Sequence, residues 1–199
     1  QFESSEPPQY ENELQLAFTV TQMADRVEAL LKSIGLVDHF SPIVYILAHG
    51  SSSANNPHHG AHDCGACSGR PGSVNARVFS LMANHSEVRK LLAVRGIIIP
   101  EQTSFIGGMH DTAADEIRFF DVEKLSESVK EFHHSKLNNF HYALELNAKE
   151  RSRRFASIQT KKSAGSIRKS IKSRSVSLFE PRPELGHGTN SVCIIGRRS

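Results

Sequence analysis

The pattern of hydrophobic and polar positions predicts a helix followed by a strand in the first quarter of the chain. Hydrophobic residues recur at helical spacing over 23–34, Thr19 or Thr21 can cap this helix, and Gly35 suits the position after its end. The run 43–48 (IVYILA) is continuously apolar and rich in β-branched residues. Such runs are typical of strands buried on both faces, which belong to parallel sheets covered by helices.

The same reasoning predicts three more helices and two more strands. Their order favours an α/β fold with a mostly parallel sheet flanked by helices. The predicted positions are a helix capped by Asn75, a helix over about 86–95 that Gly96 ends, strands over 104–106 and 116–120 separated by a loop containing His110 and Asp111, and a long helix from about 126 into the 150s.

Composition divides the chain into four parts. Residues 1–12, with two prolines and several acids, are expected to form a disordered lead-in or a severed linker. Residues 13–150 carry the predicted α/β domain. Residues 151–175 are basic, serine-rich and expected to be less regular, and residues 176–199 are expected to pack back on the domain. Because residue 1 is Gln, we expect the natural N-terminus to lie upstream.

Charge and cysteine usage narrow the possible settings. No apolar run approaches the length of a membrane span, and three cysteines do not make a disulfide framework, which favours a reducing compartment. The net charge of +3 is concentrated in the last quarter. We interpret the basic run 151–174 first as a solvated segment and second as a surface facing anionic lipid. Nucleic-acid binding ranks last, because the run has almost no interleaved aromatic residues.

The loop 49–73 is the candidate for chemistry, because it directly follows the predicted buried strand and is rich in potential metal ligands. It can be a solvated polar loop with inert cysteines. It can also hold a self-contained zinc site built on Cys64-x-x-Cys67 with nearby histidines. In a third interpretation His49, at the end of the strand, and Cys64, in a Gly-containing turn, are two rigid ligands of a larger site. The candidate ligands are His49, His58, His59, His62, Asp63, Cys64 and Cys67.

A series of short motifs, in one order, resembles the DabA family. The resemblance covers the chain from about residue 20 almost to its end. The motifs are AHGSSSANNP (48–57), DCGAC (63–67), NAR (75–77), Val88-Arg89, Gly96-Ile97-x-Ile99-Pro100, Thr103, His110-x-Thr112-x-x-Asp115, Arg182-Pro183-Glu184 and Asn190.

The resemblance implies a partial β-carbonic-anhydrase-like domain with half of a zinc site. In that pattern a Cys and an Asp from an early Cys-x-Asp-x-Arg segment bind zinc together with a later His and Cys. His49 and Cys64 match the later pair, whereas Cys67 falls outside the pattern. The early segment is absent from this chain, so its ligands are expected upstream. Possible supporting residues around the metal are Asp63, Arg77 and His110.

The resemblance also implies a function for the full-length protein. It would be a zinc-binding subunit of an energy-coupled inorganic carbon uptake system, in which zinc-bound hydroxide hydrates CO₂ to bicarbonate. Its expected partner is a membrane cation-conducting subunit of the DabB type. The expected location is peripheral, on the cytoplasmic side of a bacterial inner membrane. The fragment alone is expected to be inactive. The alternative is a small self-contained zinc- or nucleic-acid-binding module that uses the local Cys/His cluster.

Overall fold

The computed structural model describes residues 10–11, 14–15, 17–52, 54, 63 and 69–179. The chain divides into two compact units, Gln1–Ile46 with Arg77–Ile106 and Leu47–Ala76 with Gly107–Ser199. The strands are a short antiparallel pair, β1 (Tyr10–Glu11) and β2 (Leu14–Gln15), and a sheet in the order β3 (Ile43–Gly50), β4 (Ser104–Asp111) and β5 (Glu116–Phe119).

In the first unit, helix α1 (Val20–Ser33) begins where the sequence predicts it. Thr19 Oγ1 accepts a hydrogen bond from the Gln22 amide at 3.2 Å, and Gln22 Oε1 accepts one from the Thr19 amide at 3.1 Å. This capping box satisfies two amides at the start of the helix. Gly35, with φ of 73°, follows the other end. The unit's core includes Met23, Val27, Leu31, Met82, Ala83, Val88, Leu92, Ile97 and Phe105.

Arg89, on helix α3 (Ser86–Val94), links the elements of this unit. Its Nε donates to the carbonyl of Ala83 at 2.9 Å, and its Nη1 donates to that of Pro100 at 3.2 Å. Its Nη2 donates to the carbonyl of Thr103 at 2.6 Å and to Asn84 Oδ1 at 3.0 Å. One guanidinium therefore ties the end of helix α2 (Ser73–Asn84) to the segment that leads into β4.

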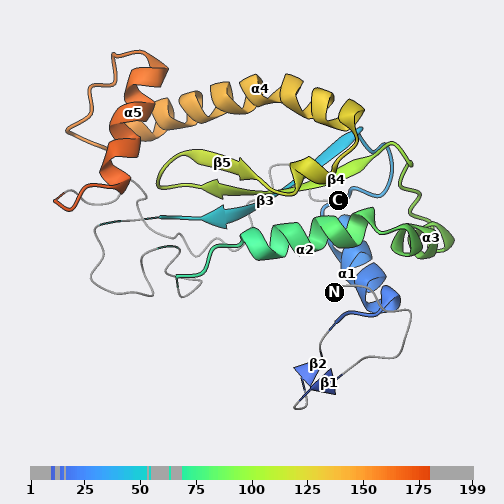
Figure 1. The fold of residues 1–199 in the computed structure, drawn as a ribbon. Helices are drawn as coiled ribbons and strands as arrows, with labels where there is room; N and C mark the ends of the chain where they lie inside the picture. Colours follow the sequence, from blue (N-terminus) through green and yellow to red (C-terminus); the bar gives the residue numbers. More distant parts are fainter. Residues whose placement is uncertain are drawn as a thin grey trace. The chain divides into compact units, whose positions relative to one another are not determined.

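In the second unit, helix α4 (Glu127–Ser152) packs on β5 and on helix α5 (Ala164–Ser175), as Figure 1 shows. A short 3₁₀ turn, Val122–Lys124, precedes α4. The Phe119 ring lies 4.8 Å from the His133 ring and 5.1 Å from the Phe140 ring, centroid to centroid. Farther along α4, Ala148 is buried with Ile167 and Ile171 of α5. These contacts fix α4 against one face of β5 and fix α5 against the C-terminal end of α4.

Strand β4 is longer than the sequence predicts, so His110 and Asp111 end the strand and do not lie in a loop. Glycine is depleted in strands, and Gly107 and Gly108 therefore obscured its continuation. Gly108 is needed for close packing. A Cβ atom there would lie 2.7 Å from Leu47 Cδ2 and 3.0 Å from the carbonyl oxygen of Arg118.

The sheet is mixed, and the expectation of a mostly parallel sheet is not confirmed. Strand β5 runs antiparallel to β4, pairing Gly108 with Phe119 and His110 with Ile117. Burial of β3 on both faces is also not observed, since Leu47 is 41% exposed. Among the described strands β3 is an edge strand of its sheet, paired on one side only. The α/β class is confirmed, whereas likeness to a β-carbonic anhydrase stays a prediction.

The basic segment 151–175 contains a helix that the sequence analysis did not predict. Its two isoleucines, four positions apart, are fully buried, but the surrounding Lys, Arg and Ser residues dominate its composition. Helix α4 continues to Ser152, past the expected boundary at 150. Most of the expected lead-in 1–12 and residues 180–199 of the expected C-terminal segment lie outside the described residues. None of the described helices combines the length and the apolarity needed to cross a membrane.

Candidate functional site

His49 is the penultimate residue of β3 and is partly buried. Its carbonyl oxygen accepts a hydrogen bond from the Gly72 amide at 2.8 Å. Gly72 approaches so closely that a Cβ atom on it would lie 2.9 Å from the Ala48 Cβ. The strand end that carries His49 is therefore fixed from one side by the segment that leads into α2.

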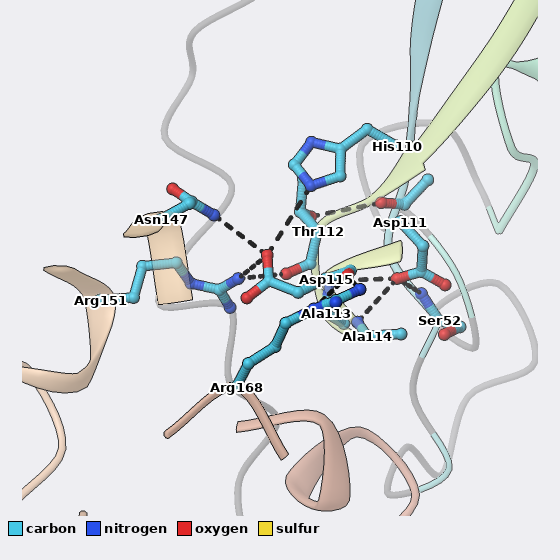
Figure 2. A network of polar contacts seen from close by, with 11 residues as sticks. Ser52, His110, Asp111, Thr112, Ala113, Ala114, Asp115, Asn147, Arg151 and Arg168 are labelled. Carbon is cyan, nitrogen blue, oxygen red and sulfur yellow. Dashed lines mark hydrogen bonds and ion pairs between the residues drawn. The ribbon is translucent and has the colours of Figure 1, made fainter. Parts of the chain in front are cut away.

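Two carboxylates hold the backbone that follows His49. Asp63 Oδ1 accepts a hydrogen bond from the Ser51 amide at 2.8 Å, although twelve residues separate the two. Asp111 Oδ1 accepts one from the Ser52 amide at 3.2 Å (Figure 2). Charged acceptors make hydrogen bonds about twice as strong as neutral ones. The loop therefore leaves the strand in a defined direction.

Asp111 also organises the turn between β4 and β5. The same Oδ1 atom accepts hydrogen bonds from the Ala113 and Ala114 amides, at 3.1 and 3.0 Å. Thr112 then returns to β3, because its amide and its hydroxyl both donate to the carbonyl of Gly50, at 2.8 and 3.2 Å. The β4–β5 turn and the loop after His49 thus share one hydrogen-bonded network.

The register of β3 and β4 places His110 beside His49. The Ser104 amide donates to the Pro42 carbonyl and the Thr112 amide donates to the Gly50 carbonyl, with the same sequence offset. In a parallel pair an amide bonds to the carbonyl of the residue just before its neighbour on the other strand, so these bonds place Leu47 beside Gly108, in agreement with their close packing. Two residues on, His49 pairs with His110. Side chains two positions apart share a face, so both imidazoles belong to the same face of the sheet.

Asp115 lies at the centre of a second polar cluster, which Figure 2 shows. Its side chain is fully buried, and its φ of 53° lies in the left-handed region that Asp and Asn tolerate best. Its Oδ1 atom lies 2.9 Å from Arg151 Nη1 and accepts a hydrogen bond from Asn147 Nδ2 at 3.0 Å. Its backbone carbonyl accepts two hydrogen bonds from the Arg168 guanidinium, at 2.8 and 3.2 Å.

Two buried polar atoms of this cluster lack a hydrogen-bond partner among the described residues, Asp115 Oδ2 and His110 Nε2. His110 Nε2 lies 3.7 Å from Asp115 Oδ1, which is within ion-pair range but beyond a hydrogen bond. Arg151 Nη1 also donates to the carbonyl of Thr112 at 2.6 Å. The cluster therefore joins α4 and α5 to the turn that contacts the loop after His49.

The structure brings together some of the residues that the sequence analysis singled out. Asp63 bonds to the backbone that follows His49, the register of β3 and β4 puts His110 beside His49, and Arg77 is an exposed residue of α2. Within the described ranges, no group of three or more His, Cys, Asp or Glu side chains is placed to hold a metal ion. The zinc ligand assignment stays a prediction, because Cys64 lies outside the described residues, as do His58, His59, His62 and Cys67.

The Asp115 cluster was missed by the sequence analysis. Its one signal in the sequence is the spacing His110-x-Thr112-x-x-Asp115, which indicates the family but not the contacts that these residues make. Arg151 and Arg168 were counted as members of a solvated basic segment. In the structure each of them donates hydrogen bonds into the cluster. Part of the basic segment is therefore structural.

A groove of about 280 Å³ lies on the second unit, against β5, α4 and α5. Its lining is part apolar and part charged, and Arg168 Nη1 lies 3.0 Å from His141 Nδ1 beside it. The groove borders the Asp115 cluster through Arg168. The lining residues are Glu116, Ile117, Arg118, Phe119, Leu137, Phe140, His141, Leu144 and Arg168.

Comparison with known proteins identifies the family. Residues 2–199 match the family described as "Probable inorganic carbon transporter subunit DabA". Proteins with that name from Azotobacter vinelandii and Nitrosospira multiformis are 55% and 57% identical to this chain over 96% and 99% of its length. A third, from Methylococcus capsulatus, is 47% identical over 91% of the chain.

The matched region is a small part of each relative. It covers 23% of the Azotobacter protein, 22% of the Nitrosospira protein and 17% of the Methylococcus protein. No solved structure matches the chain. The family match covers nearly every residue and agrees with the motifs around His49, Cys64 and Asp115. The chain belongs to the DabA family of probable inorganic carbon transporter subunits.

Proposed function

We propose that this chain is part of an inorganic carbon transporter subunit and that, in the full-length protein, His49 and Cys64 are two of the zinc ligands of a site that hydrates CO₂ to bicarbonate. The proposal is supported most directly by the 2.8 Å hydrogen bond between the Ser51 amide and Asp63 Oδ1. This bond holds the residue next to Cys64 in the sequence against the backbone that directly follows His49. The names of the relatives supply the substrate class.

The residues present fit a zinc ion in the chemistry of their donors. Imidazole and thiolate are its usual ligands, and His49 stands on a strand end that two carboxylates help to fix. When bound, zinc supplies a water molecule whose pKa is lowered towards neutrality. His49 would hold the metal from the end of β3. Asp63, the residue before Cys64 in the sequence, accepts a hydrogen bond from the Ser51 amide, and His110 lies beside His49 on the same face of the sheet.

We further propose that the full-length subunit lies on the cytoplasmic side of a bacterial inner membrane, bound to a cation-conducting membrane subunit of the DabB type. The word "subunit" in the relatives' names supports a partner for those proteins. Exposed basic residues on this chain, among them Arg153, Arg154 and Lys162, suit contact with anionic lipid headgroups. The partner would supply the driving force, so hydration would be coupled to uptake.

Growth of a carbonic-anhydrase-deficient bacterium in air tests this proposal. The full-length subunit, produced together with its membrane partner, should restore growth, and His49→Ala or Cys64→Ala should each abolish the rescue. The matched control is His134→Ala, which removes an exposed histidine from α4. Rescue that survives both ligand substitutions at normal protein levels would show that these residues do not hold an essential metal.

A further inference from the structure

We propose that Asp115 is a positioning residue for the site around His49 and that it acts through the turn between β4 and β5. The inference rests on the proposed function, because it assigns Asp115 a role in holding the zinc ligand His49 and the loop that follows it. Asp115 itself is held by two helices and reaches the site through its neighbours in the turn and through His110.

Helices α4 and α5 anchor Asp115. Its carboxylate is fully buried and bound by Arg151 and Asn147, both on α4, and its carbonyl is bound by Arg168 on α5. Removing one partner of a buried ion pair is strongly destabilising, because the remaining charge is left uncompensated. The left-handed backbone at Asp115 directs the chain from the turn into β5. Two helices thus determine where the turn lies.

Hydrogen bonds connect the turn to the loop after His49. Arg151 donates to the carbonyl of Thr112 as well as to Asp115. The Thr112 amide and hydroxyl hold the carbonyl of Gly50, and Asp111 holds the Ser52 amide. A shift of the turn would therefore move the backbone immediately after His49. Metal sites lose affinity when such supporting contacts are removed, typically by 10- to 100-fold.

His110, the neighbour of His49 in the sheet, also lies close to Asp115. Its Nε2 atom and Asp115 Oδ2 are buried and without hydrogen-bond partners among the described residues, and Nε2 lies 3.7 Å from Oδ1. A buried polar group without a hydrogen-bond partner is unfavourable. A small rotation of the imidazole would bring it onto the carboxylate. Asp115 is therefore placed to orient the His110 ring on the face that it shares with His49.

The test uses the full-length protein with zinc as the probe. Asp115→Asn retains a residue suited to the left-handed backbone but removes the charge that faces Arg151. We expect a 10- to 100-fold loss of zinc affinity in competition with a chelator, and a changed absorption spectrum when cobalt replaces zinc. Arg151→Met should give the same result. Arg151→Lys, which keeps a charged donor, should restore most of the affinity.

Two controls separate positioning from general destabilisation. Lys172→Met breaks the exposed ion pair with Glu116, also between α5 and the sheet, and should leave zinc affinity unchanged. Hydrogen exchange over α4 identifies variants that have lost their fold. If Asp115→Asn fails to fold, the two Arg151 variants decide the question.

Wild-type zinc affinity and cobalt spectrum in folded Asp115→Asn, or in folded Arg151→Met if the former does not fold, would overturn the inference. His49→Ala is measured in parallel. If it loses zinc while the Asp115 and Arg151 variants do not, the inference fails and the proposed function stands. If His49→Ala keeps its zinc, the proposed function fails and the inference fails with it.

Discussion

At the scale of single residues, His133 gives the second unit a pH-dependent stability. It is buried against the Phe119 ring, and this burial lowers the pKa of its imidazole below the ordinary 6.5, with a smaller contribution from the neighbouring charge of His134. The unfolded segment therefore binds a proton at a pH where the folded one does not. Stability rises as pH rises through the window below 6.5 and reaches its full value above it.

We expect hydrogen exchange over α4 in the full-length protein to show greater local protection at pH 7.5 than at pH 5.5, after correction for intrinsic exchange rates. His133→Phe keeps an aromatic ring against Phe119 and removes the titration, so it should reduce this difference. His134→Ala, at an exposed position, should retain most of it. An equal pH dependence in His133→Phe and the wild type would contradict the assignment.

The candidate site illustrates what a sequence can predict about single residues. His49 is predictable, because a continuous apolar run ends next to it and a loop rich in ligands follows. The pair formed by Asp115 and Arg151 is not, because 36 residues separate them and each belongs to a segment with a plausible local explanation. Their proximity depends on how α4 packs. Local periodicity carries no information about that packing.

At the scale of elements, the expected cap of α2 at Asn75 is wrong, because the helix begins at Ser73. Helices α1 and α3 agree with the prediction, and their ends carry local signals. The capping box at Thr19 and the positive φ of Gly96 are such signals. Strand β4 was shortened in the prediction because its glycines serve contacts with other strands, which strand propensity does not reflect. Helix α5 was missed because its two buried isoleucines depend on a partner surface around Ala148. Local sequence patterns therefore do not predict the elements that are defined by tertiary contacts.

Gly108 provides the test at this scale. Gly108→Ala would place a methyl group 2.7 Å from Leu47 Cδ2, 3.0 Å from the Arg118 carbonyl oxygen and 3.2 Å from Phe119 Cδ1. Because one of these neighbours is backbone, the strands must separate, and we expect a loss of about 1–3 kcal/mol in stability. Hydrogen exchange over β4 and β5 measures this loss. Gly165→Ala is the matched control, since its methyl group meets only the flexible Glu145 carboxylate, and unchanged protection in Gly108→Ala would contradict the packing argument.

At the scale of the whole molecule, the chain carries two of the four residues that the proposed zinc site would need as ligands. It spans about a fifth of the length of its relatives, and none of its three cysteines is followed two positions later by Asp. Two ligands leave a tetrahedral site half formed. We therefore expect the full-length protein to bind about one zinc ion per chain and the 199-residue chain alone to bind zinc weakly, as measured by metal analysis after dialysis.

The comparison is informative only if the separate chain is folded, so its helical circular dichroism must be established first. Cys67→Ala then distinguishes the two interpretations of the ligand-rich loop. In the proposed site Cys67 is not a ligand, and its substitution should leave the zinc content of the full-length protein unchanged, whereas Cys64→Ala should remove the metal. In a self-contained module Cys67 is essential. Stoichiometric zinc in the folded 199-residue chain, lost on Cys67→Ala, would therefore show that the chain binds zinc by itself. It would contradict the proposed site and the role of His49 in CO₂ hydration.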